Sequence, residues 1–409
     1  MIGYKICWKK IDFKMYMTII FLLIPYFRPD VIPEMLGESW INNLFTVWRI
    51  LSFLYIALNY IFVIKHKKKI FSEGSLVIII LYEIVLLYSC IHNGVAISTR
   101  LVDMANFIGV YLIYRYYSKI NSKILIKANF DLLFILVIIN AVLTLVFPNG
   151  LNFAMVDSGR INFLGKDNIV TLVFILSIIF SVLYSNINSS SIRPLLMIIT
   201  VAITELFYFS GSGIVSLAII ILYMCFLNRN QFINKILIPK LVVLIYLIIE
   251  ILVVFFNYTN FLNFLFKWLH KSVTFTDRRY YWDTAIKQLL HSPIIGQGSG
   301  ETFLWNNNYY SHNALLDVLL KGGVIGAVIW IILLLIVFKN VKGDKNLKIK
   351  GLFTMSFFSL LLIGLMEGLE DRIIFNIFLC VVIALREFEK QDILKNAIVN
   401  TKVKVRKNE

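Results

Sequence analysis

The sequence predicts an all-α, multi-pass membrane protein, and three observations support this fold class. Of the 409 residues, 59% are hydrophobic and only 16% are charged, whereas soluble domains average about 45–50% apolar and about 25% charged residues. Apolar runs of about 20 residues, the length of a transmembrane helix, recur along the chain. Short polar breaks separate these runs, and a helix is the element that satisfies its own backbone hydrogen bonds in lipid.

We expect about twelve transmembrane helices in a single integral membrane domain covering residues 1–409. The lysine-rich N-terminus and its short apolar run mimic a signal peptide, but no small-residue cleavage site follows, so we expect a retained first helix. The twelve spans are expected to begin near Lys14, Asn43, Ser75, Leu101, Asn129, Asn168, Pro194, Gly213, Leu241, Ala314, Gly351 and Arg372.

The net charge of +16 is distributed as in a membrane protein and not as in a nucleic-acid-binding protein. Most of the 40 lysines and arginines lie at the termini and in alternate polar breaks. Cytoplasmic loops of membrane proteins carry such an excess of positive residues. We therefore expect both termini in the cytoplasm, a basic cytoplasmic tail over residues 387–409, membrane lipids as partners, and no nucleic-acid partner.

This topology places two substantial loops on the extracytoplasmic side, at residues 149–167 and 257–312. The second loop is much longer than the connections usual between packed helices, which indicates a functional role. Apolar residues at helical spacing after Arg278 predict a short helix within it. A new helix is expected to follow, with Ser311 or Asn313 as its cap.

Neither a metal centre nor a disulfide framework is predicted. The four cysteines form no C-x-x-C pair, and most of them fall in or beside apolar runs. The five histidines are scattered along the chain without an H-E-x-x-H motif. We read the cysteines as small core residues.

Three arginines are candidates for binding an anion outside the membrane. Arg278 and Arg279 lie in the large loop and Arg160 lies in the smaller one. A guanidinium group binds phosphate oxygens through two parallel hydrogen bonds and stays charged at all relevant pH values. The alternative is that these arginines only anchor the loops to lipid head groups.

His312 is the candidate general base, because a neutral imidazole accepts a proton near pH 7. It lies where the large loop meets the next span. The alternative is a hydrogen-bonded structural histidine, and His270 and His291 are competitors for the catalytic role.

Candidate sugar-binding residues are Trp282, Trp305, Asn313 and Glu367. Aromatic faces stack on sugar rings, although tryptophans and tyrosines also form belts at membrane interfaces. Glu367 belongs to a charged cluster at a helix junction, which lines either a sugar-binding mouth or a solvated turn.

Four segments together resemble the O-antigen polymerase and O-antigen ligase superfamily. They are "RRYYW" at residues 278–282, "HSPIIGQG" at 291–298, "HNALLDVLLKGGVIG" at 312–326 and "GRINFLGKDN" at 159–168. Their order matches the arginine, tryptophan, P-x-x-G-x-G, His-Asn and paired-glycine signature of that superfamily. The resemblance rests on the four segments taken together.

The resemblance implies a GT-C-like helical glycosyltransferase that acts at the outer leaflet on a glycan linked to undecaprenyl pyrophosphate. Such enzymes need no cofactor, metal or nucleotide sugar. The resemblance implies that His312 is the general base, that Arg278 is catalytic, and that Arg160, Arg278 and Arg279 hold the pyrophosphate. It also implies that four glycines are structural: Gly296, Gly298, Gly323 and Gly326.

The chain departs from the superfamily at one turn. Many members carry a Ser-Arg pair after the seventh span, where this chain has "FSGSG" at residues 209–213. The donor phosphate is then left to Arg160 and Arg278, with Arg279 as a further candidate.

The abundance of Ile, Lys, Asn and Phe is typical of an AT-rich bacterial genome. We therefore expect a capsular or exopolysaccharide repeat-unit polymerase in the bacterial cytoplasmic membrane, with a chain-length regulator and a flippase of the same pathway as partners. One alternative is a ligase that transfers a lipid-linked glycan to another acceptor. The other is a lipid-linked oligosaccharide flippase or transporter, although the internal repeats usual in transporters are not seen.

Overall fold

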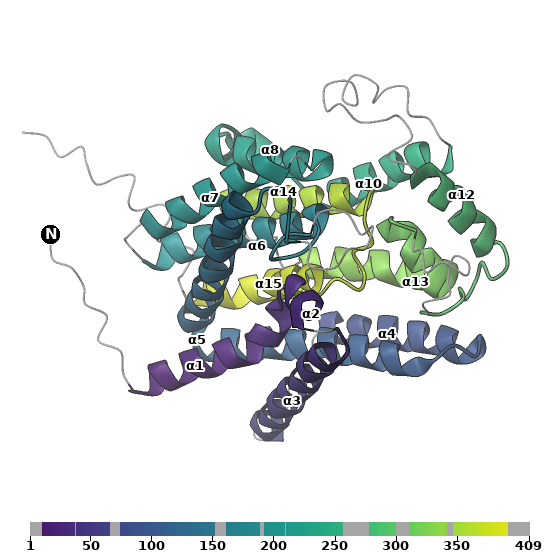
Figure 1. Ribbon diagram of the computed structural model, residues 1–409, viewed down its shortest axis with the longest axis horizontal. Helices are drawn as coiled ribbons and strands as arrows, with labels where there is room; N and C mark the ends of the chain where they lie inside the picture. The colour runs from purple at the N-terminus through teal and green to yellow at the C-terminus, as the bar shows by residue number, and fades with distance from the viewer. Residues whose placement is uncertain are drawn as a thin grey trace, which may run out of the picture.

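The computed structural model describes residues 10–36, 38–65, 74–151, 161–188, 192–208, 210–256, 278–299, 311–339, 341 and 347–391. Every named element in these ranges is a helix (Figure 1). The prediction of an all-α fold is confirmed. A single isolated bridge between Asn162 and Gly165 is the closest approach to a strand in the described ranges.

The helices follow one another along the chain. The N-terminal half holds α1 (Lys10–Leu23), η1 (Ile24–Phe27), α2 (Val31–Leu36), α3 (Glu38–Lys65), α4 (Gly74–His92), α5 (Ile97–Val146) and α6 (Asp167–Ile187). The remainder holds α7 (Ile192–Tyr208), α8 (Gly211–Cys225), η2 (Leu227–Arg229), α9 (Gln231–Ile236), α10 (Pro239–Glu250), η3 (Ile251–Phe255), α12 (Arg278–Leu289), α13 (Ala314–Lys339), α14 (Leu347–Gly364) and α15 (Ile373–Lys390).

The expected spans coincide with these helices. Eleven of the expected starts fall within a helix, and Arg372 directly precedes α15. α5 covers two expected spans and is broken between them at Asn121, whose backbone is non-helical at φ −154° and ψ 93°. Among the described residues, 6 helices are long and apolar enough to cross a membrane. The chain is therefore a multi-pass membrane protein, and the count of twelve stays a prediction.

The remaining boundary predictions fall partly outside the described residues. In the larger predicted loop the described parts are residues 278–299, which begin with α12, and residues 311 and 312. In the predicted tail, α15 continues to Lys390, and Glu387 is buried and pairs with Arg115 at 3.1 Å. The start of the predicted tail is thus a helix end packed against α5.

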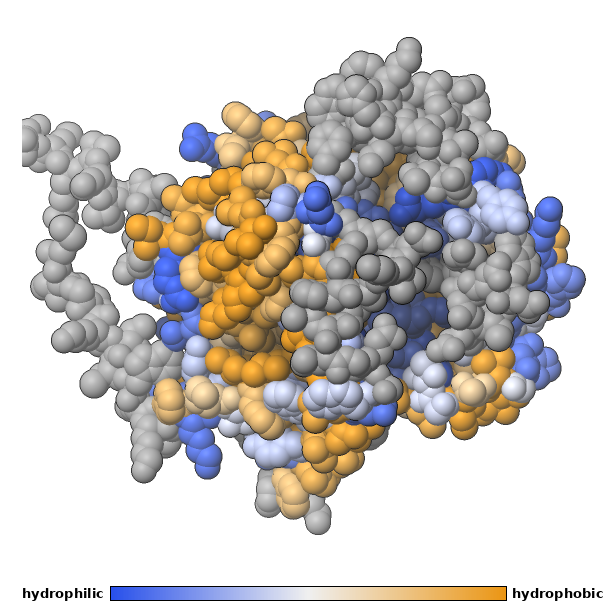
Figure 2. Space-filling model, in the orientation of Figure 1, coloured by the Kyte–Doolittle hydropathy of each residue, from blue (hydrophilic) through white to orange (hydrophobic). Residues whose placement is uncertain are grey.

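α6 forms the centre of the bundle, and α3 lies at its edge. Every residue of 170–181 in α6 is buried, whereas α3 exposes many apolar side chains, including Leu44, Leu51 and Leu58. In Figure 1, α3 projects away from the other helices. Figure 2 shows hydrophobic surface over α3 and α5, and hydrophilic surface near α12. An exposed apolar helix face of this kind suits contact with lipid.

α13 is a broken helix whose interruption is filled by the segment that follows α12. At Gly323 the backbone turns to φ 62° and ψ −163°, which interrupts the helical hydrogen bonds. The amides of Val324 and Ile325 instead donate to the carbonyls of Pro293 and Ile294. In return, the amides of Gln297 and Gly298 donate to the carbonyls of Leu320 and Lys321 at 2.7 and 3.0 Å.

This exchange matters because an unsatisfied backbone group is costly where water is excluded. The two segments approach so closely that glycine is required at the contact. A Cβ on Gly323 would lie 2.2 Å from the carbonyl oxygen of Ile294, and one on Gly296 would lie 2.5 Å from the Gly323 nitrogen. A Cβ on Gly298 would lie 2.9 Å from Cys90 in α4. Gly326, by contrast, has ordinary room, with its nearest neighbour at 3.7 Å.

The glycine contact gives a direct stability prediction. Gly323→Ala is expected to lower the melting temperature of the purified protein strongly, because both the positive φ and the clash with Ile294 oppose a side chain; backbone strain alone costs about 1–3 kcal/mol. Gly326→Ala, one helical turn away, is the matched control and is expected to melt like the wild type. Equal melting temperatures for the two variants would contradict this account of the broken helix.

Candidate active site

His312 sits between two buried neighbours at the start of α13. The Asn313 side-chain oxygen accepts from the Leu316 amide at 2.8 Å and so caps the helix, and its amide nitrogen donates to the Leu365 carbonyl at 3.3 Å. The Ser311 hydroxyl hydrogen-bonds Asp317. These bonds fix the backbone around His312, whose φ of 52° is the one positive value among the described non-glycine residues. Such strained backbone persists where the surroundings over-determine it, and it clusters at active sites.

Arg278 approaches His312 from a different helix. It is the first residue of α12, and its Nη2 lies 3.2 Å from Oε1 of Glu367. Nδ1 of His312 lies 3.7 Å from the other carboxylate oxygen of Glu367. The Tyr281 ring, one helical turn after Arg278, lies 5.6 Å from the His312 ring. The Glu367 carboxylate therefore stands between the arginine and the histidine.

Glu367 belongs to the connection between α14 and α15, at residues 365–372. Its Oε1 also accepts from the side-chain amide of Asn168 at 2.9 Å. Asn168 in turn accepts from the hydroxyls of Ser210 and Ser212 at 2.6 and 2.9 Å. The α7–α8 turn is thus part of the site through these serines, although it holds no arginine.

These contacts decide the ionisation of Glu367. Burial would raise the pKa of this carboxyl group, but His312, the hydrogen bond from Asn168 and the charge of Arg278 outweigh burial and lower the pKa to about 2. The separation of 3.7 Å from His312 exceeds hydrogen-bond distance, so that contribution is mainly charge attraction. A carboxylate beside an imidazole stabilises the imidazolium that forms when the ring accepts a proton.

A cluster of buried charges holds the connection that carries Glu367. Arg100 of α5 lies 2.8 Å from Glu370, and it also pairs with Glu83 of α4. Lys321 of α13 lies 2.7 Å from Glu370 and pairs with Asp371 as well. Buried charges are tolerated when they are paired in this way, so the cluster ties the connection to α4, α5 and α13.

Several other candidate residues are held by protein partners in this structure. Arg279 forms an ion pair with Asp283 at 2.6 Å and donates to the Val254 carbonyl at 2.7 Å, at the end of η3. Trp282 is fully buried against apolar side chains of η3 and α13. The Asn313 side chain is fully buried as a helix cap. A sugar reaching Trp282 or Asn313 would have to displace these contacts, which favours structural roles for both.

Arg160 and Trp305 lie outside the described residues, as does the competing His270. His291 is exposed in the turn after α12. The contribution of Asn168, Ser210 and Ser212 was not anticipated from the sequence. Asn168 is the last residue of the segment "GRINFLGKDN", and the two serines lie in the turn that departs from the superfamily pattern. The sequence therefore marked both segments, but it gave no role to these three residues.

Comparison with protein families supports the resemblance seen in the sequence. Residues 195–331, from α7 into α13, match the family model described as O-antigen ligase. The matched segment covers 137 of the 409 residues. Arg278 and His312 both lie inside the matched segment, whereas Glu367 and Asn168 lie outside it. No curated protein and no solved structure matches the chain.

The match supports the resemblance to the O-antigen ligase and polymerase superfamily, whose members are glycosyltransferase-like enzymes. Membrane proteins of that superfamily act on lipid-linked glycans. The geometry around Glu367 is consistent with that chemistry, because it brings a fixed positive charge and an imidazole together.

The lowered pKa of Glu367 gives a pH prediction. A carboxyl group whose folded-state pKa is depressed contributes stability above its unfolded-state value of 4.5, and that contribution is lost as the pH falls from 4.5 toward 2. The full shift corresponds to about 3 kcal/mol. We expect the wild-type melting temperature to fall more steeply than that of Glu367→Gln between pH 5 and 3, as measured in detergent.

Asp12→Asn in α1 is the matched control for that experiment and should retain the wild-type pH profile. Parallel profiles for wild type and Glu367→Gln would show that Glu367 is not held as a carboxylate by Arg278, Asn168 and His312.

Proposed function

We propose that the protein is a polysaccharide polymerase that joins undecaprenyl-pyrophosphate-linked oligosaccharide repeat units at the outer leaflet of the bacterial cytoplasmic membrane. The observation that carries this proposal is the Glu367 carboxylate, which sits between Arg278 and His312. These two residues mark the two ends of the described part of the predicted outer loop. A pyrophosphate held by the arginine and a hydroxyl presented to the histidine would therefore meet at one place.

In the proposed reaction, Nε2 of His312 removes the proton from a hydroxyl group on the acceptor's terminal sugar. The hydroxyl oxygen attacks the anomeric carbon of the donor sugar as the bond from that carbon to the pyrophosphate oxygen breaks. Base assistance of this kind contributes about 10²–10⁴-fold to a rate. Direct displacement inverts the anomeric configuration, and Glu367 stabilises the imidazolium that forms.

The leaving group is undecaprenyl pyrophosphate, whose negative charge grows in the transition state. A preorganised guanidinium group stabilises that charge more in the transition state than in the ground state, which accelerates the reaction. Arg278 is the residue we place in this role, together with Arg160 and, after a change of partner, Arg279. The route uses guanidinium groups where other enzymes use a metal ion, and it needs no nucleotide sugar.

A ligase is the second candidate function, and the description of the matched family favours it. Ligase and polymerase would share every site residue and differ in the acceptor. The composition typical of an AT-rich genome favours a capsular or exopolysaccharide polymerase. A flippase has less support, because the matched family consists of glycosyltransferase-like enzymes and a flippase has no need for a general base.

Replacement of the proposed base tests the mechanism. His312→Ala is expected to fold and to lose polymer formation by about 10²–10⁴-fold, because the variant lacks the proposed general base. His291→Ala, in the exposed turn after α12, is the matched control and should form wild-type polymer. The measurement is the ladder of glycan chain lengths made by membranes that contain each variant, and a full ladder from His312→Ala would remove His312 from the mechanism.

Deletion of the gene distinguishes the candidate functions. Loss of a polymerase is expected to leave single repeat units on the cell surface, because export continues without elongation. Loss of a ligase would leave long chains still attached to lipid, and loss of a flippase would leave single units inside the cell. Gel analysis of surface and lipid-linked glycan separates the three outcomes, and only the first agrees with the proposed polymerase.

A further inference from the structure

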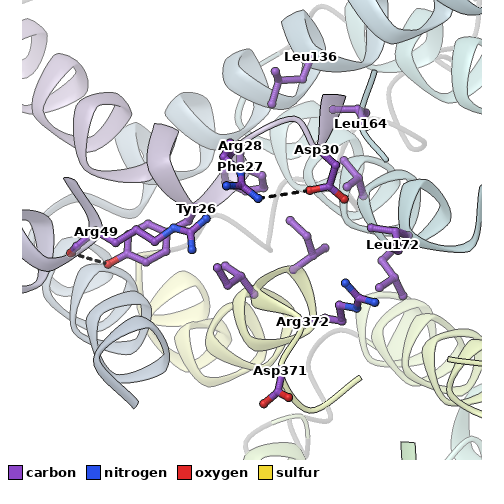
Figure 3. Close-up of a pocket in the computed structure, with 14 residues that line it drawn as sticks. Tyr26, Phe27, Arg28, Asp30, Arg49, Leu136, Leu164, Leu172, Asp371 and Arg372 are labelled. Atoms are coloured by element: carbon purple, nitrogen blue, oxygen red, sulfur yellow. Dashed lines mark hydrogen bonds and ion pairs between the residues drawn. The ribbon is translucent and has the colours of Figure 1, made fainter. Parts of the chain in front are cut away.

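A second group of arginines surrounds a pocket that the proposed reaction does not use. The pocket lies among η1, α3, α6 and the start of α15, and Arg28, Arg49 and Arg372 line it (Figure 3). It encloses about 770 Å³ of space between atoms, its open mouth included. In Figure 3, Arg28 and Arg49 approach from one side of the pocket and Arg372 from the other.

Arg49 is an arginine inside an apolar helix. It lies within the stretch Trp40–Phe62 of α3, which is long and apolar enough to cross a membrane. A charge in such a segment is costly and marks a functional position by default. Its Nε donates to the Pro25 carbonyl at 2.9 Å, and its two terminal nitrogens have no hydrogen-bond partner among the described residues. Those nitrogens are available to an anion in the pocket.

Arg28 is also incompletely satisfied by protein groups. Its Nη1 donates to the side chain of Asn42, and its Nη2 lies 3.9 Å from Asp30. Its Nε is buried and has no partner among the described residues. A buried donor without a partner costs free energy, and an anion bound in the pocket would offer acceptors near it.

The N-terminus of α15 adds a fourth positive element. Arg372 is its N-cap residue and forms no side-chain cap, and the first turn holds no acidic residue. Ile373 and Ile374 of that turn line the pocket. The free amides and the dipole at the start of a helix favour a bound anion. A helix of 18 residues therefore points its positive end at the same space as the three guanidinium groups.

The acidic residues at the pocket do not balance this charge. Burial raises the pKa of Asp30, although Arg372, Arg28 and Arg49 oppose the shift, so this carboxyl group is more readily neutralised than an exposed one. Asp371 points away from the pocket centre in Figure 3 and pairs with Lys321 and Arg100. The pocket is therefore positive overall.

The remaining wall of the pocket is apolar, which indicates a ligand that carries a hydrocarbon chain. Leu136, Leu172 and Val173 line this part. The neighbouring α3 exposes Leu44 and Leu51, a surface suited to lipid. A phosphate group attached to a lipid chain matches both halves of the pocket, whereas a free phosphate ion would leave the apolar wall unused.

The pocket and the candidate active site both use residues from the start of α6 and from the connection that precedes α15. Asn168 of α6 donates to Glu367, and the next residue, Ile169, lines the pocket. Glu367 and Arg372 belong to the same short connection before α15. A ligand in the pocket would therefore be anchored beside the site, on the same side of the bundle as Arg278 and His312.

We propose that the pocket formed by Arg28, Arg49 and Arg372 binds the pyrophosphate of the second lipid-linked substrate, the acceptor whose hydroxyl group reaches His312. This assignment rests on the proposed function, because a polymerase must hold two lipid-linked glycans at once. Arg278 holds the donor pyrophosphate, and the pocket holds the acceptor pyrophosphate, so each substrate has its own anion site.

The test measures binding of undecaprenyl pyrophosphate to the full-length protein in phosphatidylcholine nanodiscs. The Arg278→Gln variant serves as the background, because it weakens the donor site and leaves the pocket as the main site. Adding Arg49→Gln is expected to weaken the remaining binding by about 10–100-fold, the range for hydrogen bonds to a charged group. Adding Arg229→Gln, an exposed arginine of η2, is the matched control and should leave the affinity unchanged.

A second variant and a second ligand test the same proposal. Arg28→Gln should weaken binding in the same way, and it serves as the test if Arg49→Gln does not fold. Undecaprenol, which has no phosphate, is expected to bind at least tenfold more weakly than the pyrophosphate. The proposal would be overturned if Arg49→Gln and Arg229→Gln, each added to Arg278→Gln, gave the same affinity for undecaprenyl pyrophosphate. It would also be overturned if undecaprenol bound as tightly as undecaprenyl pyrophosphate.

Competition identifies the source of the phosphate. If phosphatidylglycerol displaces undecaprenyl pyrophosphate at equal concentration, the pocket is a general lipid head-group site and the acceptor assignment is wrong. If it does not, the acceptor assignment is supported. A separate transfer assay with two lipid-linked repeat units tests the proposed function: a wild-type protein that binds in the pocket but forms no polymer would overturn the polymerase and not the pyrophosphate site.

Discussion

The placement of the whole site depends on the pairing of buried charges at residues 365–372. Glu370 is buried, and its carboxylate forms ion pairs with both Arg100 and Lys321. Removal of one partner from such a group typically costs about 3–5 kcal/mol, because an unpaired charge is left without water. The connection is therefore held against three helices. Glu367 lies three residues before Glu370, so its carboxylate is presented at a fixed position.

The broken helix α13 imposes a second constraint. Its first residues follow His312, and its interruption at Gly323 is filled by residues 293–298, the segment that follows α12. The backbone hydrogen bonds that satisfy the break therefore also fix α12 relative to α13. Arg278 begins α12, and His312 precedes α13. A purely structural requirement, the pairing of backbone groups away from water, thereby sets the distance between the two proposed functional residues.

Charge at this end of the bundle is divided between two places. At the first, Arg278 and His312 share the single carboxylate of Glu367. At the second, Arg28, Arg49 and Arg372 line a pocket that Asp30 and Asp371 also line. The connection 365–372 contributes to both, through Glu367 and Arg372. Two separate positive sites on one connection suit a reaction in which two anionic lipids must be held side by side.

The sequence by itself determined the helical membrane fold and indicated the two ends of the candidate site, because apolar periodicity and motif spacing are local properties of the chain. It marked Arg278, His312 and the glycines at residues 296 and 323. Only the tertiary structure decided which groups face one another. It turned Arg279 toward Val254, buried Trp282 and directed Lys321 to Glu370, although Asp317 is only one helical turn away. It also placed Glu367 beside Arg278, 89 residues earlier. Contacts across such separations depend on how helices pack and on which buried charges find partners, and local spacing encodes neither.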